Sequence, residues 1–160
     1  MRTTTITVIK SLIFLIFVAS LGAVYIPFSL LPKGPQVETS IFAYFAFPLW
    51  FLGGVTVLWC YWNFTFKGYG TPAPIEPPKQ LVTTGLYRYV RNPIYVGALI
   101  IIVGYFLWFK SIWMFAYAVA FFLFVHMLVI LYEEPTLRGK FGAEYENYCK
   151  SVPRWIPKLK

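Results

Sequence analysis

Long uncharged segments dominate the pattern of hydrophobic and polar positions along this chain. Four stretches contain no Asp, Glu, Lys or Arg, and they are 22, 28, 18 and 22 residues long: 11–32, 39–66, 92–109 and 111–132. A helix rises 1.5 Å per residue, so roughly 20 apolar residues cross the ~30 Å hydrocarbon core of a bilayer. We therefore predict an all-α integral membrane protein with about four transmembrane helices.

The connections between these stretches refine the prediction. Lys110 alone separates the last two, which predicts a tight helical hairpin. The second stretch is long enough for one tilted span, but Pro48 and the pair Gly53-Gly54 leave open a break into two segments. One span and two spans both remain interpretations of this stretch.

The distribution of charge indicates an orientation. Twelve of the 14 Lys and Arg residues lie in segments 1–10, 67–91 and 133–160, and only Lys33 and Lys110 lie in the other two connections. Basic residues concentrate on the cytoplasmic side of membrane proteins. We expect both termini and the 67–91 loop to face the cytoplasm. A net charge of +8 would suggest nucleic acid in a soluble protein, but here its placement excludes that partner.

Composition supports lipid as the surrounding medium. The chain is 59% hydrophobic and 12% charged, whereas globular domains carry about 25% charged residues. The two cysteines, Cys60 and Cys149, have neither the spacing of zinc ligands nor that of a disulfide framework. We expect no metal site and a single membrane domain, 1–160.

The segment between the second and third stretches begins with a loop rich in Pro and Gly, 67–78, which predicts an extended conformation. Further along, Asn92-Pro93 has the residue types of a helix N-cap and first helical position. A helix N-terminus carries free N–H groups and partial positive charge, which suits an anionic group. We expect this helix end at the cytoplasmic membrane surface.

The C-terminal segment opens with two adjacent carboxylates, Glu133 and Glu134, where the last stretch ends. Apolar residues then recur at near-helical spacing and predict an interfacial helix: Leu137, Phe141, Tyr145 and Tyr148. Beyond it, Pro153 and Pro157 bracket Arg154, Trp155 and Ile156. We expect this tail to fold back over the membrane face, with Trp155 as an interface anchor.

Two blocks of these residues resemble a known superfamily. The first is segment 85–97, Gly-Leu-Tyr-Arg-Tyr-Val-Arg-Asn-Pro-Ile-Tyr-Val-Gly. The second comprises Glu133-Glu134, segment 141–148 and Val152-Pro153-Arg154. Together they resemble the isoprenylcysteine carboxyl methyltransferase and phospholipid methyltransferase superfamily. Both blocks occur in the right order, separated by one helical hairpin, and region 79–157 is the expected methyltransferase core.

The resemblance implies an integral-membrane enzyme that uses S-adenosylmethionine at the cytosolic membrane surface. It also implies which residues bind this cofactor: Gln80, Leu81, Val82, Tyr87, Asn92, Pro93, Ile94, Tyr95, Glu133 and Glu134, with Lys79 beside them. The chemistry is compatible, since carboxylates suit the cofactor's ammonium or ribose hydroxyls and tyrosines suit adenine or the sulfonium. Arg88 or Arg91, with the helix N-terminus, suits its carboxylate.

Each of these features also has a simpler interpretation. Arg88 and Arg91 are equally typical of membrane anchors beside lipid phosphates. The Glu pair is also consistent with a solvated helix end, and Tyr87 and Tyr95 with ordinary interfacial aromatics. The sequence leaves these alternatives open.

The chain departs from the family pattern at two places. Many members have His where this chain has Asn92, and eukaryotic prenylcysteine enzymes place a substrate-binding Arg shortly before the Glu pair. No Arg occurs in 125–132, so a free carboxylate is a poor acceptor, because it would be buried without a partner. We expect an uncharged or cationic polar group on a hydrophobic body, such as an amine headgroup or a thiol.

His126 is the one residue within the four stretches whose side chain ordinarily titrates near neutral pH. It lies two helical turns before Glu133 and is a candidate catalytic residue on the acceptor side, or else a packing hydrogen-bond partner. We predict methyl transfer from S-adenosylmethionine to a lipophilic, membrane-resident acceptor. The alternative is a small four-span transporter or structural membrane protein; a proton-coupled exporter would need an acidic residue inside a span, and no stretch contains one.

Overall fold

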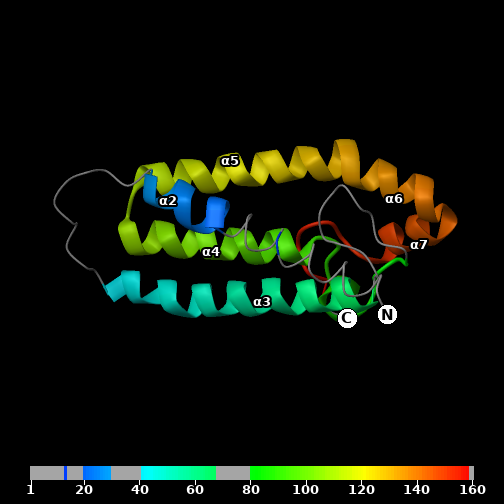
Figure 1. Cartoon of the computed structure of the whole chain (residues 1–160), viewed down its shortest axis with the longest axis horizontal. Coiled ribbons are helices and arrows are strands. Elements are labelled where there is room, and N and C mark those ends of the chain that lie inside the picture. Colours follow the sequence, from blue (N-terminus) through cyan, green and yellow to red (C-terminus); the bar gives the residue numbers. More distant parts are fainter. Residues whose placement is uncertain (1–12, 14–19, 30–40, 68–79, 159–160) are drawn as a thin grey trace.

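The computed structural model describes residues 13, 20–29, 41–67 and 80–158, and every regular element among them is helical. Figure 1 shows three long helices side by side: α3 (Ala46–Lys67), α4 (Pro93–Phe109) and α5 (Ile112–Leu128). Helix α4 lies in the middle and packs against both others. The all-α prediction is therefore confirmed for the described residues.

The first uncharged stretch is described only in part. It contributes a π-helical turn, η1 (Ser20–Tyr25), and one further helical turn, α2 (Ile26–Ser29). The Tyr117 hydroxyl of α5 donates a hydrogen bond to the Gly22 carbonyl at 2.8 Å, and the Phe28 ring contacts Phe109. These pieces lie against the hairpin of α4 and α5. Half of the expected first span, and the expected loop 67–78 beyond Lys67, lie outside the described residues.

The second stretch forms one continuous helical segment. A 3-10 helix, η2 (Ile41–Phe45), leads directly into α3. Pro48 is the third residue of α3, in the first turn, where proline is tolerated. The pair Gly53-Gly54 remains helical. Of the two alternatives for this stretch, the break into two segments is not observed between Ile41 and Lys67, which form one continuous helical segment.

Glycines allow α3 and α4 to approach closely. A Cβ atom on Gly53 would lie 2.7 Å from the Gly97 carbonyl oxygen, and one on Gly97 would lie 3.0 Å from the Gly53 oxygen. Such contacts between small residues are typical of helices packed within membranes. The Trp50 indole N–H of α3 donates to the Ile101 carbonyl of α4 at 3.2 Å, which fixes the register of the two helices.

The predicted hairpin between α4 and α5 is confirmed. Helix α4 ends at Phe109, and Lys110 follows in the left-handed conformation, with φ of 47°. Its N–H donates to the Phe106 carbonyl at 2.8 Å. Ser111 then adopts an extended conformation as the N-cap of α5, so two residues reverse the chain.

Helix α5 does not end at the two carboxylates. It continues through a π-helical turn, η4 (Val129–Glu133), into α6 (Glu134–Phe141). Pro135 lacks a backbone N–H, but it stands near the start of α6, and the neighbouring Thr136 hydroxyl donates to the Tyr132 carbonyl at 2.7 Å. The interpretation of the pair as a solvated helix end is therefore wrong, because the helix continues beyond the pair to Phe141 and Glu134 is buried.

The expected interfacial helix is divided into two by Gly142. This residue has φ of 50° and ψ of −124°, a conformation that favours glycine. It joins α6 to α7 (Ala143–Ser151). The predicted apolar positions do pack together: Leu137 and Phe141 of α6 lie against Tyr145, Tyr148 and Val152. Figure 1 shows α6 and α7 at one end of the three-helix layer.

In the described part of the chain, two helical segments are long and apolar enough to cross a membrane, Ile41–Asn63 and Ile112–Phe141, and α4 is a shorter apolar helix. Large apolar side chains cover their outward faces, including Phe51, Trp62, Phe124 and Leu131. Such faces suit a lipid surrounding. The total of four spans remains a prediction.

Candidate active site

The segment that precedes α4 packs against the end of α3. It contains a 3-10 turn, η3 (Gly85–Arg88), and here Val82 and Tyr87 form a buried cluster with Cys60 of α3. Burial raises the pKa of the Tyr87 phenol well above its ordinary value, so the hydroxyl stays neutral near pH 7. Leu81 instead packs against the Tyr145 and Tyr148 cluster of α7.

Asn92 and Pro93 begin α4 as predicted, with Asn92 at the N-cap position and Pro93 as the first helical residue. The Asn92 side chain does not cap the helix. Its amide donates to the Arg154 carbonyl at 3.2 Å, and the backbone N–H of Arg91 donates to the Pro153 carbonyl at 2.9 Å. The C-terminal tail therefore covers the start of α4.

Further bonds hold the tail in place. The Tyr148 hydroxyl donates to the Tyr87 carbonyl at 2.6 Å, and the N–H of Lys158 donates to the Tyr89 carbonyl at 3.1 Å. Burial raises the pKa of Tyr148, so this phenol keeps the proton that it donates. The expectation that the tail folds back is confirmed within the described residues.

Glu134 lies at the centre of a cluster of arginines. Its carboxylate is 2.6 Å from Nε of Arg154, 2.9 Å from Nη1 of Arg91 and 3.8 Å from Nη2 of Arg138. The Glu134 side chain is only 5% exposed, and its hydrogen bond to Arg154 raises the pKa of that guanidinium. One buried carboxylate thus joins α6, the segment before α4 and the tail.

Glu133 has different surroundings. Its carboxylate accepts a hydrogen bond from the Tyr95 hydroxyl, which comes from the first turn of α4. Among the residues that the structure describes, no Lys or Arg forms an ion pair with Glu133. Within the described part of the chain, this half-buried carboxylate thus contacts a neutral hydroxyl and no cation.

His126 also contacts the tail. The Trp155 indole N–H donates to Nδ1 of His126 at 3.0 Å, and the Phe122 ring lies against both rings. Because an indole N–H only donates, Nδ1 carries no proton, and a neutral His126 carries its proton on Nε2. Trp155 is thereby fixed against α5.

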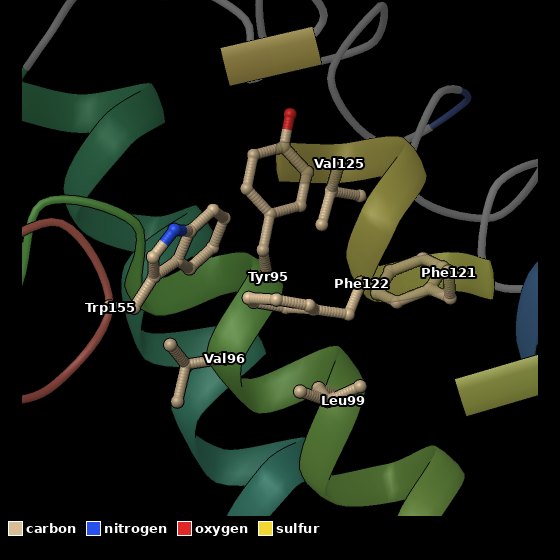
Figure 2. A pocket seen from close by; sticks show the side chains of 7 residues that line it. All are labelled: Tyr95, Val96, Leu99, Phe121, Phe122, Val125 and Trp155. Carbon is tan, nitrogen blue, oxygen red and sulfur yellow. The ribbon is translucent and has the colours of Figure 1, made fainter. Parts of the chain in front are cut away.

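A cavity of about 130 Å³ lies between α4, α5 and the tail. Figure 2 shows the side chains that line it: Tyr95, Val96 and Leu99 from α4, Phe121, Phe122 and Val125 from α5, and Trp155. Tyr95 and Leu99 are one helical turn apart and share a face of α4. The Tyr95 hydroxyl points away from Leu99 (Figure 2) and reaches Glu133.

The described residues thus combine an apolar cavity, a carboxylate without a cation and an arginine cluster that holds a covering tail. A comparison with known protein families identifies the family to which this sequence belongs. The model of the phospholipid methyltransferase family matches residues 41–144, more than half of the chain. The chain belongs to the phospholipid methyltransferase family.

A sequence relative supports the same family. The chain is 37% identical over 87 residues to the methanethiol S-methyltransferase of Crocosphaera subtropica, a match that covers 50% of this chain. It covers 30% of the relative, so this chain spans less than a third of the length of the protein it matches. Family membership and the apolar helices identify a membrane protein of a methyltransferase family.

The structure brings together most of the positions that the family resemblance implies. Tyr95 meets Glu133, and the segment with Leu81, Val82 and Tyr87 lies beside the tail. Pro93 is buried at the start of α4, and Ile94 packs on the Tyr87 cluster. Two positions remain apart: Gln80 is exposed at the start of the described loop, and Arg88 is exposed with its guanidinium over the Tyr89 ring.

Sequence reasoning missed the contacts that this candidate site makes between residues far apart in the chain. Arg91 and Glu134 are 43 positions apart, and Asn92 and Arg154 are 62 apart. Arg154 was visible as part of the Val-Pro-Arg motif, but no rule of spacing pairs it with Glu134. A buried carboxylate requires a cationic partner, and that requirement is the signal that points to Arg154 once Glu134 is known to be buried.

Proposed function

We propose that this chain transfers a methyl group from S-adenosylmethionine to a lipophilic acceptor in the membrane. Membership of the phospholipid methyltransferase family supports methyl transfer, whereas it lends no support to the alternative of a transporter or structural protein. The observation that carries the proposal is the Tyr95–Glu133 pair at the edge of the apolar cavity. Here the family's motif segment meets its carboxylate pair.

The charges of the site fit a cationic cofactor. Glu133 has a carboxylate with no cationic partner among the described residues, and a buried charge of this kind is costly unless a ligand compensates it. S-adenosylmethionine supplies a methyl group on a positively charged sulfonium, together with an ammonium. Glu133 would bind the ammonium, which S-adenosylhomocysteine also carries, and Tyr95 would hold the carboxylate in place.

The other predicted positions have distinct proposed roles. Segment 80–82 and Tyr87 flank the site, and Asn92, Pro93 and Ile94 shape the start of α4 beside it. Glu134 acts indirectly in this proposal, because three arginines already compensate its charge. It holds Arg91 and Arg154, and through them the tail that excludes water from the reaction.

Binding of S-adenosylhomocysteine to detergent-purified protein tests this proposal. Glu133→Gln removes the charge but keeps the shape, and it should weaken binding roughly ten- to hundredfold, since a charge-assisted contact is worth ~1.5–3 kcal/mol. Glu144→Gln is the matched control, because Glu144 is exposed on α7. Absence of binding by the parent protein, or equal loss in both variants, would contradict the proposal.

The orientation of the site belongs to the same proposal. The excess of Lys and Arg on alternate segments supports a cytoplasmic location of both termini and the site. Cysteine labelling should find Lys79→Cys and Lys160→Cys accessible from the cytoplasm, and Lys33→Cys and Lys110→Cys from outside. Cytoplasmic labelling at position 33 would contradict the four-span arrangement.

The acceptor is proposed to be a neutral sulfur nucleophile. The relative from Crocosphaera subtropica is named for methyl transfer to methanethiol, a small thiol. A thiol is neutral near pH 7, whereas an amine is protonated there. Isotope-labelled S-adenosylmethionine should therefore yield labelled thioethers from added thiols in detergent, and selective formation of methyl esters on a prenylcysteine would contradict this assignment.

A further inference from the structure

The cavity beside Tyr95 has the character of an acceptor site rather than a cofactor site. Its lining is aliphatic and aromatic, and its two polar atoms are already engaged: the Tyr95 hydroxyl contacts Glu133, and the Trp155 N–H contacts His126. No lining residue offers a charged side chain to the carboxylate or ammonium of S-adenosylmethionine, and none offers an unengaged polar side-chain atom to its ribose. An apolar cavity of this kind favours an apolar occupant.

We propose that this cavity binds the hydrocarbon body of the acceptor and limits it to about the size of a benzene ring. This inference rests on the proposed function and names the substrate class for the same site. The cavity volume is about 130 Å³, and an engineered apolar cavity of ~150 Å³ in another protein holds one benzene molecule. The acceptor class is a small, uncharged thiol with a short alkyl or aromatic body.

The charge balance of the reaction also favours a neutral thiol. As the new sulfur–methyl bond forms, the thiol S–H bond breaks, and the proton passes through the Tyr95 hydroxyl to the Glu133 carboxylate. The methyl group leaves the cofactor, whose sulfur keeps the bonding electron pair and becomes neutral. The proton that Glu133 accepts replaces the positive charge that the sulfonium loses, so the net charge of the site does not change during the reaction.

Leu99 is the residue that sets the size limit. It lies one turn deeper along α4 than Tyr95, at the opposite end of the cavity from the Tyr95 hydroxyl (Figure 2). A body that enters beside Tyr95 therefore meets Leu99 after about 6 Å, the rise of four helical residues. Shortening this side chain deepens the cavity, and enlarging it fills the cavity.

The experiment uses full-length protein saturated with S-adenosylhomocysteine. It measures the affinity of this protein for unreactive methyl alkyl sulfides of increasing chain length. In the parent, the affinity should rise about fourfold for each added methylene, as expected for burial of apolar area. It should stop rising when the alkyl chain fills the cavity. Leu99→Ala should extend the rise by roughly two to three carbons, the part of the side chain removed. Leu99→Phe should abolish sulfide binding. Leu123→Ala is the matched control, because Leu123 is exposed on α5.

The outcomes separate this inference from the function on which it rests. S-adenosylhomocysteine binding in the parent and in both Leu99 variants shows that the cofactor site is intact. With that binding retained, an unchanged chain-length limit in both Leu99 variants would overturn the cavity assignment. Failure of the parent itself to bind S-adenosylhomocysteine would overturn the proposed function.

Discussion

Glu133 and Glu134 are neighbours in sequence and have opposite surroundings. Glu134 is buried and contacts three guanidinium groups, whereas the described partner of Glu133 is the neutral hydroxyl of Tyr95, a residue that lines an apolar cavity. Successive residues of a helix point about 100° apart, so one carboxylate faces the tail and the other faces α4. A pair that looks redundant in the sequence thus divides into a carboxylate that joins three segments of the chain and one that our proposal assigns to a ligand.

The helix around the pair makes this division possible. The π-helical turn Val129–Glu133 carries α5 into α6 without a break, so both carboxylates project from an ordered helix rather than from a fraying end. Helical turns of this type are frequent at functional sites. The tail then supplies Arg154 to one carboxylate and Trp155 to the wall of the cavity, which links the two environments.

The largest expected effect is on stability, in Glu134→Gln. This change leaves Arg91 and Arg154 without their buried counter-charge, and breaking a buried ion pair typically costs about 3 kcal/mol or more. Thermal unfolding in detergent should show a clear decrease in Tm. Glu144→Gln should leave the Tm unchanged, and an unaltered Tm in Glu134→Gln would refute the structural role of the cluster.

A smaller loss is expected for Arg154→Gln. Arg154 is 29% exposed, so the hydrogen bonds to Glu134 should be worth about 1.5–2 kcal/mol rather than the full value of a buried pair. Loosening the tail should speed hydrogen exchange at the amides that bond across it, those of Arg91 and Lys158. Exchange mass spectrometry measures this directly, and unchanged protection at both amides would contradict the tail's attachment through Arg154.

Tyr95→Phe should affect the other carboxylate alone. The variant keeps the ring in the cavity but removes the hydroxyl that holds Glu133. We expect roughly tenfold weaker binding of S-adenosylhomocysteine, about the worth of one hydrogen bond to a charged group, with no change in Tm. Equal losses of binding and of stability would show that the two carboxylates are not separate in function.

The smallest effect is expected for His126→Ala. His126 contacts Trp155 rather than the cavity, so we interpret it as a positioning residue. The KM for a thiol acceptor should rise by about threefold, because a neutral hydrogen bond contributes roughly 0.5–1.5 kcal/mol. Binding of S-adenosylhomocysteine should not change, and His126→Gln should restore the KM. A large loss of kcat with unchanged KM would instead assign chemistry to His126.

Local signals predicted those parts of the fold that are set within a few residues. Asn92-Pro93 predicted the start of α4, Lys110 the hairpin, and the two prolines around Trp155 a tail that folds back. The continuation of the helix past Pro135 was not predictable in this way. Proline is compatible with a helix only near its start. Pro135 stands near the start of α6 because a π-helical turn precedes that helix, and this turn leaves no pattern in the sequence.

The site was predictable as a set of residues but not as a set of contacts. The motif blocks named both carboxylates and Tyr95 together, yet they assigned the same role to Glu133 and Glu134. The difference depends on Arg91 and Arg154, which approach Glu134 only in the folded chain. Likewise, the cavity depends on Phe121 and Phe122 of α5, whose aromatic pattern is common to all the apolar stretches.

The most direct test measures S-adenosylhomocysteine affinity and Tm in parallel for Glu133→Gln and Glu134→Gln. The division of roles predicts that Glu133→Gln loses ten- to hundredfold in affinity, ~1.5–3 kcal/mol, at an unchanged Tm. Glu134→Gln should lower the Tm, and below that Tm it should retain most of the affinity. The reverse pattern, with Glu133→Gln destabilised and Glu134→Gln folded but unable to bind, would contradict the assignment of the two carboxylates.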